Sequence, residues 1–554
     1  MIPKKNNSRA GKVFVIIVIV ILLIVLAGFI GWNLYKYKFI KGKVKTAVFE
    51  KSNGLYTIRY DKMELDEVGG YLHVTNLQII PDTIKFRQMV TDRKNPGLLL
   101  ELTVPELKIS GVKTPEAMLN KKVSGRKLEV SNATVVFYYA KAHPDTSDPA
   151  VKQEMYQQLL GNLKEIQADT VEVTNVSLAF IDIRTSKKTI EASNISIHLN
   201  DVLIDSLHAN DSSRFFFAKQ VQVNGEKGVV KNKTGTYFYH FDGFSFTNEN
   251  GLFAIKSIRI EPQLNEEKFA AFSKLQDDRF NVSLAGVSLK NINLTRLMES
   301  DLIAGELLIK GLNIRVYRDL SYPRDKIVRV GTFPQQLLMD LPLNLSLKKI
   351  ILNDAFIEYK EKNPKSDYSG KVQFVHANAV ISNVTNETGR IKENNHCLLD
   401  FNARFLDMAP MHAHLDMLLN DKKGRFTYRG SMEGFEASKL NVLMEPMGLA
   451  KIDKGQVNKV DFNFAGQNYG ADGKLTLLYD DLKITLLKKD SADDTFKKKK
   501  LASFIANIIV KNSNPTGHKP VRVADVHYQH DTNRSFFNLM WKSIYTGVKQ
   551  TAGM

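Results

Sequence analysis

One ten-residue pattern recurs along this chain and constrains its fold more than any other feature. Apolar residues alternate with other residues on either side of a central Asn or small residue, as in LEVSNATVVF at Leu128–Phe137 and VEVTNVSLAF at Val171–Phe180. Alternation with a period of two is typical of a β-strand. Further copies are YLHVTNLQII at Tyr71–Ile80, IEASNISIHL at Ile190–Leu199, VSLKNINLTR at Val287–Arg296, LLIKGLNIRV at Leu307–Val316 and IILNDAFIEY at Ile350–Tyr359.

The apolar phase of this pattern slips by one residue at its centre. Leu128 and Val130 share one parity, whereas Val135 and Phe137 have the other. Such a slip sends later side chains to the opposite face of a sheet unless a bulge or corner absorbs it. Asn and Gly tolerate the unusual backbone angles of a corner. We therefore expect a mainly β chain in which one kinked unit, used many times, builds an elongated, twisted or folded-over sheet rather than a compact enzyme core.

Helices are expected to be few and short. Asp148–Ala168 has an apolar stripe after a capping Asp, and Asn265–Leu275 and Asn293–Leu302 are two further candidates. A last interruption of the strand pattern falls at Phe333–Leu341. We expect these segments to cap or border the sheet.

The N-terminus carries an unbroken apolar run, Val13–Trp32. About 20 such residues cross a bilayer as a helix. A cleaved signal peptide is the alternative, but its apolar part is shorter, roughly 7–15 residues, and no small-x-small cleavage site follows. We predict a short cytoplasmic tail and an uncleaved signal anchor, followed by exported β-repeat regions and a tail with a strand and an amphipathic helix. The expected boundaries are 1–12, 13–35, 36–300, 301–495 and 496–554.

The chain is basic, with a formal net charge of +18. A positive charge of this size is also typical of nucleic-acid-binding proteins. However, the Lys and Arg residues are scattered, apart from those beside the apolar run and at Lys497–Lys500, and no nucleic-acid-binding motif accompanies them. We interpret the positive charge as that of a solvated basic surface that faces lipid. The single cysteine, Cys397, excludes an intramolecular disulfide and a Cys-based zinc site.

No catalytic motif is found in the sequence. Glycine-rich phosphate loops, GxSxG, HExxH and CxxC are all absent. His412 and His414 form an HxH pair, and His527 and His530 an HxxH pair, but spacing fixes no further ligand for a metal. We therefore expect a protein that is not an enzyme and has no metal or other cofactor.

The last residues predict an amphipathic helix at Ser535–Gln550. Its apolar stripe includes a Trp, and Lys residues lie beside it. Two interpretations stay open: the stripe docks on a membrane or partner, or it packs on its own domain. The stripe consists of Phe537, Met540, Trp541, Ile544 and Val548.

The segment Leu440–Asp490 resembles the C-terminal signature of the AsmA-like proteins of Gram-negative envelopes. Pro446 stands near the usual Pro, Gly455 matches the turn glycine, and Gly473 and Tyr479–Lys483 match the last strand. The following segments FIANIIVKNSNP and RSFFNLMWKSIYTGVKQTAG are similar to the tail of Bacteroidetes-type members.

The resemblance implies a single-pass inner-membrane protein with its bulk in the periplasm. TamB and the chorein-type bridge proteins are more distant relatives, and the family is linked to outer-membrane integrity and phospholipid movement along a greasy β groove. No catalytic residues carry over. Candidate groove positions are the inward apolar residues Val130, Val173 and Leu352, which a sealed core would explain equally well.

The expected partners are membrane phospholipids, the inner membrane and an envelope protein, and not nucleic acid. The alternative function is a scaffold that assists outer-membrane protein assembly through its strand edges.

Overall fold

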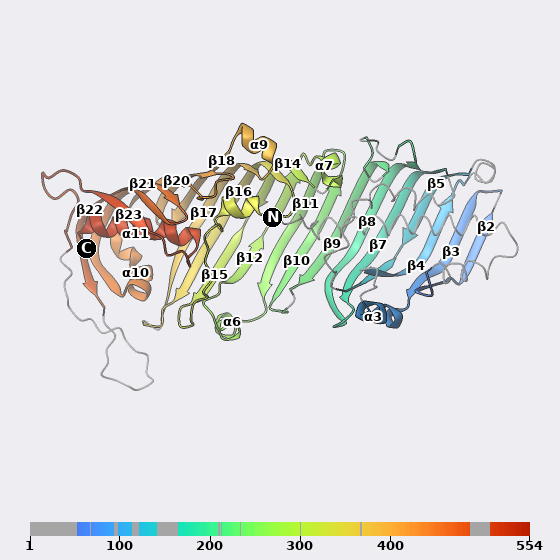
Figure 1. The fold of residues 1–554 in the computed structure, drawn as a ribbon, viewed down its shortest axis with the longest axis horizontal. Helices are drawn as coiled ribbons and strands as arrows, with labels where there is room; N and C mark the ends of the chain where they lie inside the picture. The colour runs from blue at the N-terminus through green and yellow to red at the C-terminus, as the bar shows by residue number, and fades with distance from the viewer. Residues whose placement is uncertain are drawn as a thin grey trace. The chain divides into compact units, whose positions relative to one another are not determined.

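The computed structural model describes residues 52–553, apart from 67, 93–97, 113–120, 141–163, 209–210, 212, 216, 233, 300, 366–367 and 488–509. The described residues are mainly β with a few short helices, as the sequence predicts (Figure 1). The chain divides into two units. Unit 1 has residues Met1–Ser257 and Leu289–Leu302, and unit 2 has Ile258–Ser288 and Ile303–Met554.

The strands of unit 1 pair in both directions. They are β1 (Tyr56–Arg59), β2 (Lys62–Asp66), β3 (Tyr71–Pro81), β4 (Leu98–Ser110), β5 (Lys122–Ser131), β6 (Thr134–Tyr139), β7 (Glu165–Asp182), β8 (Lys187–Asp205), β9 (Ala218–Lys231) and β10 (Tyr237–Thr247). β5 and β6 lie parallel to β7, whereas β3–β4, β7–β8, β8–β9 and β9–β10 are antiparallel. Three strands contain a boundary between the units: β11 (Leu252–Pro262), β13 (Gly286–Lys290) and β14 (Leu302–Lys310).

The strands of unit 2 form a long antiparallel series with one parallel step. They are β12 (Arg279–Leu284), β15 (Asn313–Asp319), β16 (Leu345–Lys362), β17 (Ser369–Thr385), β18 (His396–Phe405), β19 (Ala409–Leu418), β20 (Phe426–Glu436), β21 (Ala450–Gln467), β22 (Gly470–Leu486) and β23 (Val523–Gln529). β12 pairs with β15, and β15 lies parallel to β16. From β16 to β23 each strand pairs antiparallel with the next.

The predicted corners are confirmed. The central residue of every copy of the repeat has a positive φ, the region that Asn and Gly occupy most readily. In two of these copies the pairing register also shifts at the corner, between Val173 and Val176 and between Leu352 and Ala355, so a bulge absorbs the phase slip there. The central residues and their φ angles are Asn76 52°, Asn132 60°, Asn175 53°, Asn194 53°, Asn291 55°, Gly311 57° and Asp354 53°.

Two of the predicted helices form, each capped by the Asn at its predicted start. α6 (Glu266–Ser273) and α7 (Leu294–Met298) have N-cap side chains that accept a hydrogen bond from the third helical residue. The predicted helix Asp148–Ala168 is wrong at its end, because β7 begins at Glu165, and its earlier part lies outside the described residues. The helices not predicted by name are α3 (Thr83–Thr91), α9 (Thr388–Glu393) and the helical turns within Ala437–Gly448.

The parallel step from β15 to β16 needs a connection that returns along the strands. Residues 320–333, which we call the strap, and α8 (Pro334–Met339) make it. Phe333, at the end of the strap, is buried against Phe426 and Phe536. The predicted interruption at Phe333–Leu341 is therefore part of this crossover, which lies over one face of unit 2.

No helix among the described residues is long and apolar enough to cross a membrane. The predicted anchor, 13–35, lies outside the described residues, as does the basic run Lys497–Lys500.

Candidate functional site

An apolar row crosses five neighbouring strands of unit 2 and stays partly open to solvent. The register places Val282, Ile314, Ile357, Phe374 and Phe405 directly side by side on β12, β15, β16, β17 and β18. Only Phe405 is buried, at 7 % exposure, and the other four are partly exposed. We call these residues the open row.

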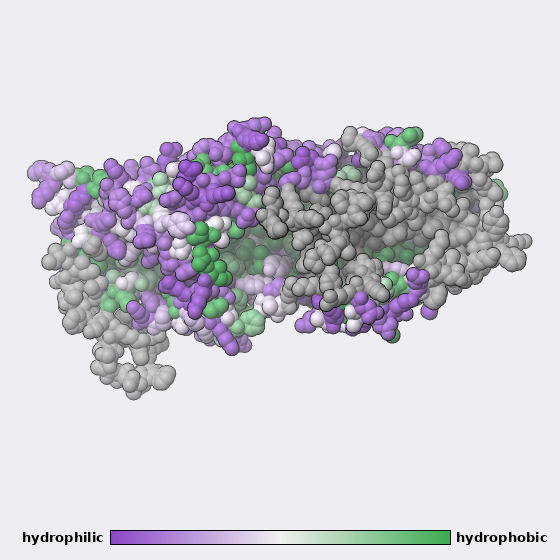
Figure 2. Space-filling view, viewed as in Figure 1, coloured by the Kyte–Doolittle hydropathy of each residue, from purple (hydrophilic) through white to green (hydrophobic). Residues whose placement is uncertain are grey.

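Small buried residues lie next to the open row. Ala355, Ala377 and Ala403 form a small cluster of their own, and the larger side chains packed on it include Leu352 and Phe401. Alanine side chains are small, and the larger side chains that pack on them, Leu352 and Phe401, remain partly exposed. Over this part of unit 2, Figure 2 shows hydrophobic side chains in a hollow between hydrophilic margins.

A second apolar row lies further along the same sheet and is sealed. Leu415, Tyr428, Phe464, Gly473 and Val526 are register neighbours on β19 to β23. Tyr428 and Phe464 are 1 % and 2 % exposed, and Val526 is fully buried. We call these residues the covered row.

The cover is α11 (Phe536–Ala552), which packs on β22 and β23 (Figure 1). Gly547 permits close contact, because a Cβ there would lie 2.7 Å from the Leu475 Cβ and 3.1 Å from the Val526 Cγ2. The Ser543 and Tyr428 hydroxyls lie 2.7 Å apart, and both are buried. Burial raises the pKa of the Tyr428 hydroxyl, so this pair stays neutral.

The helix predicted at Ser535–Gln550 is confirmed, but it is held by a different stripe from the predicted one. Its buried side chains are those of Phe536, Leu539, Ser543, Thr551 and Ala552, with Gly547 between them. The small residues Ser543, Gly547 and Thr551, which are four positions apart, are the feature of the sequence that could have indicated this contact. In the predicted stripe, Phe537 is 71 % and Trp541 39 % exposed, and Met540, Ile544 and Val548 are partly buried against the core.

The predicted groove residues fall into two groups. Val130 and Val173 are register neighbours in unit 1, with exposures of 0 % and 1 %. Leu352 lies in unit 2 and is partly exposed. Of the three, only Leu352 is open to solvent beside the open row.

Charged residues occupy the strand ends beside the open row. Arg318 on β15 is the register neighbour of Glu361 on β16. Its guanidinium donates two hydrogen bonds to the Asp278 carboxylate, of 2.8 and 2.6 Å. The Tyr359 hydroxyl donates to Glu361 at 2.7 Å, and its pKa is raised by burial and by that carboxylate. These charged and polar side chains, which we call the polar end, therefore adjoin the open row.

The strap adds more arginines at this polar end. Arg329 makes two bonds with Asp325, of 2.9 and 2.6 Å, and its backbone N–H donates to the Thr532 carbonyl. Arg324 on the strap and Arg534, just before α11, both approach Asp531, at 3.7 and 3.8 Å. The strap and the start of α11 are thus tied together by charged groups.

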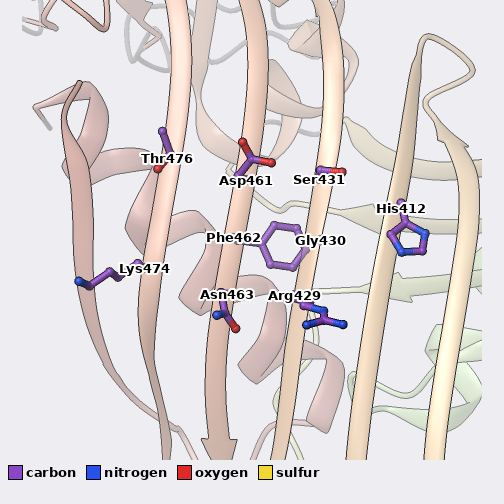
Figure 3. A pocket seen from close by; sticks show the side chains of 9 residues that line it. All are labelled: His412, Arg429, Gly430, Ser431, Asp461, Phe462, Asn463, Lys474 and Thr476. Atoms are coloured by element: carbon purple, nitrogen blue, oxygen red, sulfur yellow. The ribbon is translucent and has the colours of Figure 1, made fainter. Parts of the chain in front are cut away.

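A shallow polar pocket lies on β19 to β22 (Figure 3). Its polar residues form two register rows, His412–Ser431–Asp461–Thr476 and Arg429–Asn463–Lys474. Gly430 leaves room for the Phe462 ring, since a Cβ there would lie 2.5 Å from that ring. The basic groups Arg429 and Lys474 and the acidic Asp461 all belong to this pocket.

The histidines that the sequence suggested as metal ligands are hydrogen-bonded within the protein. His412 and His414 do share a face, but their Nδ1 atoms lie 2.9 Å from Asn402 and 2.7 Å from Asp400. His527 faces Asp472 at 2.8 Å, and buried His530 meets the Asn468 carbonyl at 2.8 Å. Within the described part of the chain, no three His, Cys, Asp or Glu residues gather closely enough to hold a metal ion.

Cys397 is buried, at 3 % exposure, and burial raises the pKa of its thiol to about 11. The thiol is therefore protonated at neutral pH and a poor nucleophile.

No protein-family model matches this chain, and no curated protein matches it.

Proposed function

We propose that this protein is an AsmA-like, membrane-anchored envelope protein that binds phospholipid acyl chains on an apolar β face. In this proposal it supports lipid transport to the outer membrane, or the integrity of that membrane, and has no enzymatic activity. The observation that carries the proposal is the open row: five register-matched apolar side chains, four of them partly exposed. Contiguous exposed apolar patches are typical of ligand-binding grooves and of protein or membrane contact sites.

The dimensions of the open row suit an acyl chain. Neighbouring strands lie about 4.8 Å apart, so five strands span roughly 19 Å. The hydrocarbon of one bilayer leaflet is about 15 Å thick. Burial of each CH₂ contributes about 0.8 kcal/mol, so such a row could hold a chain without an energy source.

The anchor and the location belong to the same proposal. The predicted anchor at 13–35 would hold the protein in the inner membrane with its N-terminus in the cytoplasm and its bulk in the periplasm. An elongated, folded-over sheet would then carry lipid away from the bilayer. In protease-treated spheroplasts, the region after Lys45 should be digested while the anchor resists carbonate extraction; protection of that region would refute the topology.

A photo-crosslinking experiment tests lipid binding. A photoreactive amino acid at Ile357 or Leu352 of the full chain should label phospholipid, because both positions lie on or beside the open row. Arg315 is the matched control, since it is exposed and its strand neighbour Ile314 belongs to the open row. Photoreactive residues at Val130 and Val173 test whether unit 1 also binds phospholipid. Crosslinks from Ile357 and Leu352 to protein only would contradict the proposal, and a barrel-protein partner among them would favour the scaffold alternative.

A further inference from the structure

The arginines at the polar end of the open row differ in how well they are neutralised. Arg318 and Arg329 each make two short bonds with an Asp. Among the described residues, Arg534 forms an ion pair with Asp531, at 3.8 Å, and Glu361 adds a weaker attraction, although the Arg534 side chain is only 18 % exposed. Arg324 approaches the same Asp531 at 3.7 Å. Two guanidiniums thus share one distant carboxylate.

The directions of the pKa shifts also distinguish Arg534 from Arg318 and Arg329. The pKa of Arg318 and of Arg329 is raised. The pKa of Arg534 is lowered, first by burial and then by the positive charges of Arg324 and Arg318. A half-buried cation beside two like charges gains stability when an anion binds.

We propose that Arg534 and Arg324 bind the phosphate of a phospholipid headgroup whose acyl chains lie on the open row. This inference rests on the proposed function and adds the headgroup chemistry to it. Guanidinium groups bind phosphate through paired N–H donors, and such charge-assisted bonds are roughly twice as strong as neutral ones.

The surroundings favour a lipid phosphate over free phosphate. Val316 precedes Arg318 by two positions on β15, and its register neighbour Phe280 is 43 % exposed. On the strap, Ile327 and Val328 are 59 % and 60 % exposed. An amphiphile satisfies both the arginines and these apolar groups, whereas inorganic phosphate satisfies only the arginines.

The test measures three ligands by native mass spectrometry of the full chain. They are dihexanoylphosphatidylglycerol, dihexanoylglycerol, which has the same chains without phosphate, and inorganic phosphate. The double variant Arg324→Gln/Arg534→Gln should bind the phospholipid at least tenfold more weakly and dihexanoylglycerol unchanged. Arg315→Gln, an exposed arginine on the same strand as Arg318, is the control and should change neither.

Each other outcome has a defined meaning. Wild-type phospholipid affinity in the double variant would overturn the headgroup site but leave acyl-chain binding intact. Failure of the wild-type chain to bind either lipid would overturn the proposed function itself. Inorganic phosphate binding as tightly as the phospholipid would reject the lipid assignment. If the double variant does not fold, Arg534→Lys replaces it: the charge remains, but loss of the paired donors should still weaken phospholipid binding, and unchanged affinity would refute the site.

Discussion

The open row and the covered row belong to one unit and follow one pattern, yet they end in different environments. Val282, Ile314, Ile357 and Phe374 are partly exposed, whereas Tyr428, Phe464 and Val526 are nearly or fully buried. Each row runs across neighbouring strands, and on each strand its residue belongs to the apolar set that alternates with residues of the opposite face. The alternation therefore determines which face is apolar, and the cover determines whether that face is a core or a surface.

The cover depends on a few small contacts. α11 reaches the sheet because Gly547 lacks a side chain and because Ser543 meets the Tyr428 hydroxyl. Over the open row, four of the five side chains stay partly exposed, and on the strap Ile327 and Val328 are exposed. A chain can thus use one repeat for both stability and ligand binding by covering only part of its sheet.

The largest expected effect compares two leucines on one register row. Leu352 and Leu475 stand at opposite ends of a row that runs from β16 to β22, and Leu475 is fully buried under α11. Leu475→Ala should lower the free energy of unfolding by about 2–5 kcal/mol, because it leaves a cavity. Leu352→Ala should cost less than half as much, since its side chain is already partly in water. Denaturant melts of both variants measure the difference, and equal losses would show that the face at Leu352 is covered in solution.

The second prediction removes the cover itself. Gly547→Leu places a side chain where a Cβ is already 2.7 Å from Leu475, so α11 must move and the free energy of unfolding should fall by about 1–3 kcal/mol. Gln550→Leu, at an exposed position of the same helix, should change it little. Proteolysis of α11 should accelerate only in the Gly547 variant. Equal behaviour of the two variants would mean that the contact with Leu475 does not hold the helix.

The corners could be predicted because they are local. A phase slip in the apolar pattern requires a bulge, and an Asn, Asp or Gly at its centre supplies the positive φ. All of the predicted corner residues, from Asn76 to Asp354, have it. The caps of α6 and α7 were predictable for the same reason, since each depends on an Asn beside its own helix.

Features that depend on distant contacts could not be predicted. Nothing in the local pattern at Val130 or Leu352 tells whether another segment covers it. Gly455 was matched to a turn by family resemblance, but it lies inside β21 at a register shift, with φ 142°. The stripe predicted for α11 includes Phe537 and Trp541, which are exposed, whereas the buried side of the helix combines Phe536 and Leu539 with small residues. The charged group around Arg318 joins segments far apart in sequence, so no spacing could indicate it.

The third prediction concerns the exposed side of α11. Phe537 and Trp541 are solvent-exposed, so Phe537→Ser/Trp541→Ser should change the free energy of unfolding by about 0.5 kcal/mol or less. If the helix docks on a membrane, the same variant should float less with vesicles of phosphatidylethanolamine and phosphatidylglycerol. Leu539→Ser, which alters a fully buried residue, is the control that should lose stability. A large stability loss in the double variant would instead assign these aromatic residues to the core.

The smallest effect lies on the solvated side of the sheet at β23. His527 faces Asp472 at 2.8 Å, and both side chains are largely exposed. The hydrogen bond and charge of Asp472 raise the pKa of His527 above its usual value of about 6.5. Because the folded-state pKa is raised, the contribution of the pair to stability is fully present below the unfolded pKa and is lost as pH rises through the folded pKa. Titration of the imidazole by NMR should show the raised pKa, a return toward 6.5 in Asp472→Asn and a smaller change in Asp525→Asn. An unchanged titration in Asp472→Asn would mean that the imidazole does not contact this carboxylate in solution.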